Sequence, residues 1–416
     1  MVKFGGSSLA NGADILKCAE SVINEKRRGT QIAVVVSAMG KTTDKLIQVA
    51  ERACGGKVSP NELDNILAMG ERTTARVFAA ALRSNGERSI YLDPSDADWP
   101  VITDDSFNNA NPILPICERQ IKEKIQPMLK NGITVVVPGF VGRTEEEAVT
   151  TMGRGGSDIT AMILARALSA EEVILVTDVD GIMSADPKII KSPERLNNIE
   201  MDTLVGLADS GSKFIHKKAL RYKSPTIDVR VINNAARDLR AEGTTIRGSF
   251  PETISVESHP DASMAVTIVG RAISESPATL QNLLQEVRNF SVPILGMSIN
   301  HNSLIFYLPM DSSNELLEAL HSIVTKDDRT LAMAVRRGLS FINVKGVGLE
   351  ETPGIIKSVS DVLTIAGINI YGIFTITSSV TLFVDLRERE RAIYLIGESV
   401  ARYTEGNVPP IEEEEG

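Results

Sequence analysis

The sequence predicts an α/β protein in which a mainly parallel sheet, sandwiched by helices, is followed by two α+β modules. Three observations favour this fold class. The run 31–37 (QIAVVVS) is apolar and rich in β-branched residues, as strands buried on both faces are. Strands and helices alternate over roughly the first 240 residues, which is typical of parallel sheets with helical crossovers. After residue 250, two shorter units repeat each other.

The elements of the first part are predicted in a regular order. A short strand opens the chain. Helices are expected over 11–28, 41–54, 61–85, 112–131 and 157–169. Further strands are expected at 31–37, 89–92, 133–138 and 172–177. Right-handed crossovers would gather the carboxyl ends of these strands, and the loops after them, along one edge of the sheet.

The second part contains an internal repeat with an offset of 76 residues. Three separated segments keep this register, because 270–277, 292–294 and 304–307 recur at 346–353, 368–370 and 380–383. Each unit reads as strand, loop, helix, strand, strand, helix, which is a βαββαβ-like module. Generic α+β patterns would rarely hold one register through three segments, so we interpret the repeat as a duplication.

The predicted boundaries follow from these patterns. They place the α/β domain at 1–245, a linker or shared strand at 246–262, the first module at 263–335, the second at 336–405 and an acidic tail at 406–416. The run Glu412–Glu415 favours a disordered tail.

The composition is that of a globular protein, with 43% hydrophobic and 24% charged residues among 416. The net charge of −10 argues against nonspecific nucleic-acid binding, and no apolar run approaches the ~18–20 residues that cross a membrane. Cys18, Cys54 and Cys117 form neither a zinc pattern nor a disulfide framework, so free thiols in a reducing compartment are expected. Lys3 already belongs to the first structural unit, so no signal peptide and a cytoplasmic location are expected.

The loop at 3–8 (KFGGSS) combines a charge with a pliable backbone. Lys3 brings a positive charge, Gly5 and Gly6 let a ligand approach the backbone, and Ser7 supplies a donor. The helix that follows would present its N-terminus to an anion. The lysine precedes the glycines, so this is not a P-loop. A phosphoryl site and a tight turn with an exposed lysine both remain open from these residues alone.

Two further loops carry groups for a small polar substrate. The segment 37–44 (SAMGKTTD) holds several hydroxyls, although a helix N-cap with Asp44 in the first turn would also explain it. In 69–72 (MGER), Glu71 could hold an ammonium group, whereas a Glu-Arg pair on a helix is more often a solvated face.

Two more loops suit anions. In 153–158 (GRGGSD), Arg154 could capture a carboxylate or phosphate with its planar fork, and capping of the helix by Ser157 and Asp158 is the alternative. The segment 177–188 (TDVDGIMSADPK) lacks the spacing of an EF-hand, so contact with a nucleotide or Mg²⁺-nucleotide is favoured over calcium.

These five loops lack the groups that other chemistries need. None of the four histidines lies in them, which argues against histidine acid–base catalysis and zinc binding there. The sequence has no G-x-S-x-G nucleophile elbow. Lysine, arginine, backbone amides and hydroxyls remain, and they suit phosphoryl transfer, in which the protein mainly positions and neutralises.

Taken in order, these motifs resemble those of the aspartokinases of the amino-acid kinase family. The set comprises KFGGSS at 3–8, SAMGKTTD at 37–44, MGER at 69–72, GRGGSD at 153–158, TDVDG at 177–181 and GSKFIH at 211–216. The likeness covers nearly the whole chain, and the two C-terminal modules resemble ACT domains, which this family uses to sense amino acids.

The resemblance implies a function and a set of partners. It implies ATP-dependent phosphorylation of the side-chain carboxylate of L-aspartate to 4-phospho-L-aspartate, the first step toward lysine, threonine and methionine. Mg²⁺ would accompany ATP. An amino-acid effector such as lysine or threonine would act through the ACT modules. Because small α+β modules with exposed sheet edges commonly pair, a homodimer through them is also expected.

The resemblance also implies a role for each matching residue. Lys3 would stabilise charge on the transferring phosphoryl group, and Asp158 would orient that lysine. The residues expected at the nucleotide are Lys3, Gly5, Gly6, Ser7, Thr177, Asp178, Met183, Asp186, Lys188 and Lys213. Those expected at the aspartate are Ser37, Thr43, Glu71, Arg154 and Ser157, with Glu71 on the ammonium and Arg154 on a carboxylate. No residue is expected to ligate a metal directly.

The chain departs from the family pattern near the nucleotide. Met183 stands where an aromatic residue is usual, and Lys188 where arginine is usual. Lys217 and Lys218 replace a proline and an arginine. Lysine keeps the charge of arginine but loses its planar fork, so these changes bear on nucleotide preference.

The first module also departs from the second. Pro293 stands opposite Asn369, and Ala278 opposite Gly354, so an effector site in the first module is either altered or lost. Two alternative functions are weighed against the main one. They are a superfamily member that acts on glutamate, N-acetylglutamate or a nucleotide, and a non-catalytic amino-acid sensor.

Overall fold

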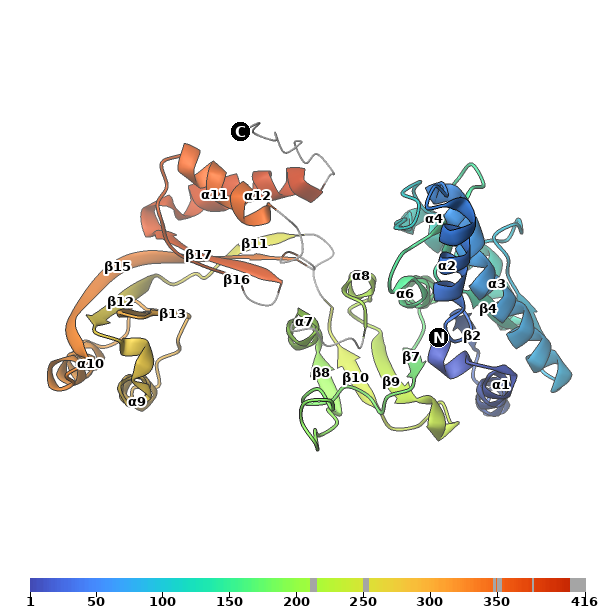
Figure 1. Ribbon diagram of the computed structural model, residues 1–416, viewed down its shortest axis with the longest axis horizontal. Coiled ribbons are helices and arrows are strands. Elements are labelled where there is room, and N and C mark those ends of the chain that lie inside the picture. The colour runs from blue at the N-terminus through green and yellow to red at the C-terminus, as the bar shows by residue number, and fades with distance from the viewer. Residues whose placement is uncertain (210–214, 250–253, 347–348, 350–353, 376–377, 405–416) are drawn as a thin grey trace. The chain divides into compact units, whose positions relative to one another are not determined.

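The computed structural model describes residues 1–209, 215–249, 254–346, 349, 354–375 and 378–404 (Figure 1). The chain splits into two compact units, Met1–Glu252 and Thr253–Gly416. Each unit has its own sheet and its own buried core. No helix in these ranges is long and apolar enough to cross a membrane.

The first unit is built on a mainly parallel sheet, as predicted. Its described strands number eight, in the order β3-β4-β2-β1-β7-β9-β10-β8. The bounds are β1 (Val2–Phe4), β2 (Ala33–Val36), β3 (Ser89–Tyr91), β4 (Thr134–Pro138), β7 (Glu172–Thr177), β8 (Asn198–Glu200), β9 (Asp228–Asn233) and β10 (Thr244–Arg247). The strands from β3 to β9 are parallel, and β10 runs antiparallel to β9. A separate hairpin joins β5 (Val141–Arg143) to β6 (Val149–Thr151).

Helices sandwich this sheet. Their bounds are α1 (Gly12–Arg27), α2 (Thr42–Cys54), α3 (Pro60–Ser84), α4 (Leu114–Gln120), α5 (Gln126–Lys130), α6 (Gly156–Leu168), α7 (Met201–Asp209) and α8 (Lys217–Leu220). Where the sequence predicts one helix over 112–131, a π-helical turn at Ile121–Ile125 joins α4 to α5. A 3-10 turn at Gly6–Leu9 precedes α1.

The alternation of side chains along β1 decides what each face of the sheet carries. Val2 and Phe4 lie in a buried cluster with residues of α1 and α3, and the Phe4 ring lies 5.3 Å from that of Phe78. Because successive strand residues point to opposite faces, Lys3 points to the other side of the sheet. There it meets the first turn of α6.

The strand register brings the loops to one edge. Phe4 pairs with Val36 and with Val176, and Val36 pairs with Pro138. The chain therefore leaves β1, β2, β4 and β7 at the same level of the sheet. Their loops meet there although they lie far apart in the sequence.

The second unit contains the two α+β modules. The described strands are β11 (Ser255–Ser258), β12 (Ser263–Gly270), β13 (Gly296–Asn300), β14 (Ser303–Pro309), β15 (Thr330–Lys345), β16 (Ile370–Thr375) and β17 (Ser379–Asp385). The helices are α9 (Pro277–Asn289), α10 (Asn314–Lys326), α11 (Ile355–Ile365) and α12 (Arg389–Thr404). The order α9-β13-β14-α10 recurs as α11-β16-β17-α12, which is the repeat seen in the sequence.

One long strand, β15, belongs to both modules. Residues 330–339 pair with β12, whereas 339–345 pair with β17. Gly338 has a φ of +77°, which a glycine adopts freely, and it interrupts the register between the two halves. Strand β11, from the segment predicted as a linker or shared strand, pairs with residues 342–345. The second module thus recruits a strand that lies before the first module in the sequence.

Candidate active site

A cavity of about 590 Å³ lies at the sheet edge where β2 ends. Four of the five predicted loops contribute to its lining. The predicted site residues that it brings together are Lys3, Gly6, Ser37, Thr43, Glu71, Arg154, Ser157 and Asp158. This convergence is what a parallel sheet with loops along one edge predicts.

Lys3 and Asp158 form an ion pair inside this cavity. Lys3 Nζ lies 2.6 Å from Asp158 Oδ1, and the two side chains are only 16% and 13% exposed. Asp158 lies in the first turn of α6, which has Gly155 as its N-cap, and its carboxylate faces the lysine. The alternative of a turn with an exposed lysine is therefore wrong.

Gly6 allows two loops to approach each other closely. Its carbonyl accepts a hydrogen bond from Gly40 N at 3.0 Å. A Cβ at this position would lie 2.8 Å from the carbonyl oxygen of Ala38, closer than real Cβ contacts allow. The glycine is thus required for the loop after β1 to rest on the loop after β2.

Glu71 lies on α3 and points into the cavity, where its carboxylate is almost completely shielded from solvent. The residue is 4% exposed, and Oε2 has no hydrogen-bond partner within the described ranges. Burial raises the pKa of Glu71 to about 7, although a hydrogen bond from the Ala38 backbone opposes the shift. The alternative of a solvated Glu-Arg face is wrong for this residue.

The neighbouring Arg72 has a structural partner instead. Its guanidinium makes a two-pronged contact with Asp93, at 2.7 and 3.0 Å, just after β3. Arg76 adds a third bond to the same carboxylate, whose side chain is 2% exposed. These hydrogen bonds hold the pKa of Asp93 below its usual range. They tie α3 to the sheet, and α3 in turn positions Glu71.

The glycine-rich loop 153–158 runs along one side of the cavity. Arg154 is exposed there, whereas Ser157 is 8% exposed. Gly155 has a φ of +78°, and a Cβ on it would collide with His216. None of the five loops contains a histidine, yet folding brings His216 against this loop, which the sequence did not predict.

The other residues predicted at the nucleotide do not line this cavity. Gly5 donates its N–H to Val176 O at 3.0 Å, and Ser7 is exposed. The remaining ones follow β7 in the loop 177–188, where Thr177, Asp178, Met183, Asp186 and Lys188 lie on the exposed or half-exposed surface. This loop leaves the sheet at the same level as β1. Lys213 lies outside the described residues.

Within the loop 177–188, local hydrogen bonds organise the aspartates. Asp186 Oδ1 accepts the N–H of Lys188 at 2.8 Å, and Thr177 Oγ1 lies 3.2 Å from Asp178 Oδ1. Asp180 Oδ1 accepts from Asn233 of β9 at 2.7 Å. No group of three or more potential metal ligands occurs among the described residues.

Folding adds cavity residues that the motifs did not identify. They include Ile47, Leu67, Asn108, Phe140 and Thr151. Asn108 and Phe140 have φ angles of +66° and +71°, which non-glycine residues rarely adopt. The Asn-Asn-Ala-Asn run at 108–111 was the available signal for Asn108, but it reads equally well as a plain turn.

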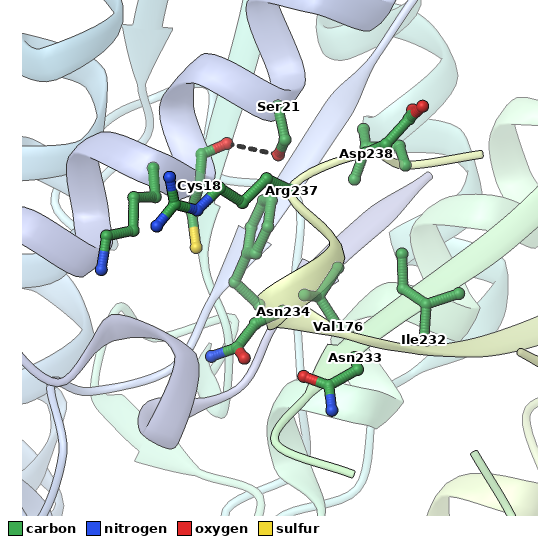
Figure 2. Close-up of a pocket in the computed structure, with 11 residues that line it drawn as sticks. Cys18, Ser21, Val176, Ile232, Asn233, Asn234, Arg237 and Asp238 are labelled. Atoms are coloured by element: carbon green, nitrogen blue, oxygen red, sulfur yellow. Dashed lines mark hydrogen bonds between the residues drawn. The ribbon is translucent and has the colours of Figure 1, made fainter. Parts of the chain in front are cut away.

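A second, much smaller pocket lies on the opposite side of β1 (Figure 2). Its volume of about 10 Å³ would hold roughly one water molecule. Phe4 and Cys18 line it, and burial raises the pKa of the Cys18 thiol to about 12. The pocket is too small for a nucleotide or an amino acid, so the larger cavity is the candidate site.

Comparisons with known proteins agree with this geometry. Residues 1–233 match the model of the amino acid kinase family. An aspartokinase from Bacillus sp. (strain MGA3) is 31% identical over 410 residues, which cover 94% of either chain. The crystal structure of an aspartate kinase from Synechocystis is 25% identical with a TM-score of 0.81, over 96% of this chain and 69% of that one. The E. coli aspartokinase III in complex with aspartate and ADP shares the fold, at 21% identity and a TM-score of 0.55, over 96% and 99% of the two chains.

Proposed function

This chain belongs to the amino acid kinase family, and we propose that it is an aspartate kinase, which phosphorylates the side-chain carboxylate of L-aspartate with ATP. The similarity to aspartokinases extends over both units, because the aligned residues cover 94% of the chain. That extent does not favour a glutamate kinase-like enzyme or a sensor without activity.

One observation carries the assignment of roles. A single cavity is lined by the Lys3–Asp158 pair, the buried acid Glu71 and the exposed Arg154. Aspartate has one ammonium and two carboxylate groups, so its binding site needs both a negatively charged and a positively charged side chain. We assign the ammonium to Glu71 and the α-carboxylate to Arg154, whose fork suits a carboxylate. Ser37, Thr43 and Ser157 supply further polar groups to the same substrate.

The reaction needs no general base from the protein. An oxygen of the side-chain carboxylate attacks the γ-phosphorus, the bond from phosphorus to the bridging oxygen breaks, and ADP leaves with the electron pair. The attacking carboxylate is already ionised at neutral pH, since its reference pKa is about 3.9. Lys3 stabilises the negative charge on the transferring group, and Asp158 holds the ammonium of Lys3 in place.

The nucleotide would extend from this point toward the loop after β7. Gly5, Gly6 and Ser7 would hold phosphates, and Thr177, Asp178, Met183, Asp186, Lys188 and Lys213 would contact the rest of ATP. Mg²⁺ would arrive with the nucleotide phosphates, because such ions usually keep several waters and need few protein ligands. The absence of a ready-made acidic cluster within the described residues suits that arrangement.

The second unit is proposed to regulate the first. We assign the modules at 263–335 and 336–405 to binding of an amino-acid effector such as lysine or threonine, and to pairing of two chains. Pro293 and Ala278 in the first module favour the second module as the effector site. A cytoplasmic location completes the proposal.

Trapping the product with hydroxylamine tests the function. The purified protein with Mg-ATP should yield hydroxamate from L-aspartate, and far less from the other carboxylate acceptors glutamate and N-acetylglutamate. A different preferred acceptor would point to another member of the superfamily, and no acyl phosphate from any acceptor would point to a sensor. Adding lysine, threonine or methionine to the same assay tests regulation.

A further inference from the structure

One uncharged hydrogen-bond acceptor in the cavity has no partner among the residues that the structure describes. Asn108 lines the cavity, and its Oδ1 atom is shielded from solvent without a hydrogen-bond partner in the described ranges. Leaving a buried acceptor unpaired costs about 1–3 kcal/mol, so native proteins satisfy most such atoms. A hydrogen-bond acceptor that is shielded from solvent and unpaired in a substrate cavity is suited to accept a hydrogen bond from a donor group of the ligand.

The backbone of Asn108 is held in an unfavourable conformation. Its φ of +66° lies in the left-handed region, which asparagine tolerates better than most residues. Its N–H donates to Asp64 Oδ2 at 2.9 Å. Asp64 is fully buried, and it also accepts the N–H and the hydroxyl of Thr151, at 2.9 and 2.5 Å. One buried carboxylate thus fixes two residues of the cavity wall.

A lysine fixes the other side of the same loop. Lys218 Nζ donates to the side-chain and backbone oxygens of Asn109, at 2.8 and 3.1 Å, and to the carbonyls of Ala110 and Met152. The loop that carries Asn108 is therefore held by α3 at Asn108 and by α8 at the residues that follow it. A group held in this way loses little freedom when a ligand binds.

We propose that the side-chain amide of Asn108 is a substrate-binding group that accepts a hydrogen bond from the α-ammonium group of aspartate. The inference rests on the proposed function, because the ammonium is the only hydrogen-bond donor of ionised aspartate. Two other shielded acceptors among the described cavity residues lack a hydrogen bond, namely Glu71 Oε2 and Asp158 Oδ1, and Asp158 Oδ1 is ion-paired with Lys3. Asp64 and Glu71 lie seven residues apart on α3, two helical turns along one face, so a single helix positions the acceptors of Asn108 and Glu71.

This arrangement has a consequence for specificity. A carboxylate alone attracts any cation, whereas a fixed neutral acceptor beside it requires a directed N–H. Sites built to hydrogen-bond a substrate group reject analogues that lack the group, because the acceptor is then left unpaired. Asn108 is thus expected to favour aspartate over succinate, which has both carboxylates but no amino group.

The test compares aspartate with succinate in variants of Asn108. Asn108→Gly removes the amide and suits the left-handed backbone, and Asn108→Asp keeps an oxygen acceptor. Asn108→Gly should raise the KM for aspartate about 10- to 100-fold, the range for a hydrogen bond to a charged group. The inhibition constant of succinate should stay within about twofold. Asn108→Asp should recover most of the affinity for aspartate.

The controls separate this inference from the proposed function. Asp105→Gly makes the same kind of change at an exposed position of the same loop and should leave both constants unaltered. An equal rise for aspartate and succinate in Asn108→Gly would show a structural role only, and an unchanged KM would also overturn the inference. Failure of the wild-type enzyme to phosphorylate aspartate would instead overturn the proposed function.

Discussion

Lys3 Nζ lies 2.6 Å from Asp158 Oδ1, which joins the middle of β1 to the first turn of α6. The two residues lie far apart in the sequence of the first unit and meet because Lys3 points to the α6 side of the sheet. The ion pair restrains the ammonium at the mouth of the glycine loop, where a phosphoryl group would lie.

Replacing Lys3 should remove most of the turnover. Lys3→Ala is expected to lower kcat by about 10²–10³-fold, the cost of losing one preorganised charge at the transition state. The KM for aspartate should change little, because the contact strengthens in the transition state. Steady-state kinetics with hydroxylamine trapping checks this. Lys45→Ala, at an exposed position of α2, is the control, and near-normal kcat in Lys3→Ala would refute the role.

The affinity for aspartate should depend on pH through Glu71. Burial raises the pKa of this carboxylate to about 7, so the free enzyme loses the negative charge as the pH falls below that value. The KM for aspartate is expected to rise between pH 7 and pH 6 in the wild type. Glu71→Gln should show a high KM with little pH dependence in this window. A wild-type KM that stays flat from pH 8 to pH 6 would contradict the assignment.

Glu71 should affect the stability of the fold in the opposite direction: a falling pH weakens aspartate binding but favours folding. Because the folded protein binds this proton more tightly than the unfolded chain, the contribution of Glu71 to stability is greatest below pH 4.5. It falls as the pH rises from 4.5 through about 7. Glu71→Gln should therefore unfold at a higher temperature than the wild type at pH 8, and the difference should shrink toward pH 5. Thermal unfolding at both pH values measures it, and a variant less stable than the wild type at pH 8 would oppose the argument.

Asp93 should be a major support of the first unit. Asp93→Ala would leave Arg72 and Arg76 without their shared partner, and breaking such a buried pair costs about 3–5 kcal/mol. The depressed pKa of Asp93 means that its contribution is present near neutral pH and is lost on acidification. Urea unfolding at pH 7 measures the loss. Asp98→Ala, which breaks the exposed pair with Lys124, should cost less than about 1 kcal/mol.

Gly372 should be intolerant of any side chain. The Tyr307 hydroxyl donates to Tyr371 O at 2.8 Å, and its ring stacks on Phe383 at 3.9 Å between centroids. A Cβ on Gly372 would collide with that hydroxyl. Gly372→Ala is therefore expected to lower the unfolding free energy of the second unit by about 1–3 kcal/mol.

Gly397 provides the matched control for that substitution. It lies in α12, and a Cβ there meets nothing within 4 Å. Gly397→Ala should raise the stability by about 0.5–1 kcal/mol, because alanine loses less backbone entropy in a helix. Thermal unfolding of the full chain resolves both. Equal effects of the two substitutions would contradict the packing argument at Gly372.

Much of the fold was predictable because its signals are local. The apolar run at 31–37 and the glycine-rich loops predict β2, the ends of the strands and the starts of the helices without any knowledge of contacts. The repeat predicts two similar modules, since duplication leaves the same residues at the same spacing. The long strand β15 and its pairing with β11 were not predictable, because pairing depends on which edges remain free after each module folds.

The site was predictable to a smaller extent, and the reason is burial. Lys3, Arg154 and Asp158 carry charges whose chemistry is visible in the sequence, and parallel strands bring their loops to one edge. The dry carboxylate of Glu71 is different, since a Glu-Arg pair on a helix looks the same whether it faces solvent or a cavity. Asn108 was still harder to predict from the sequence. Its proposed role depends on a loop that Asp64 and Lys218 hold from distant elements.

The sequence by itself therefore determined the kind of chemistry, the order of the elements and the residues that supply charge. These properties follow from side-chain type and periodicity, which are local. The tertiary structure decided which polar atoms are deprived of water and which are left without a partner. Burial and hydrogen bonding depend on contacts between distant segments. They set the pKa of Glu71 and leave Asn108 Oδ1 shielded from solvent without a hydrogen-bond partner in the described ranges.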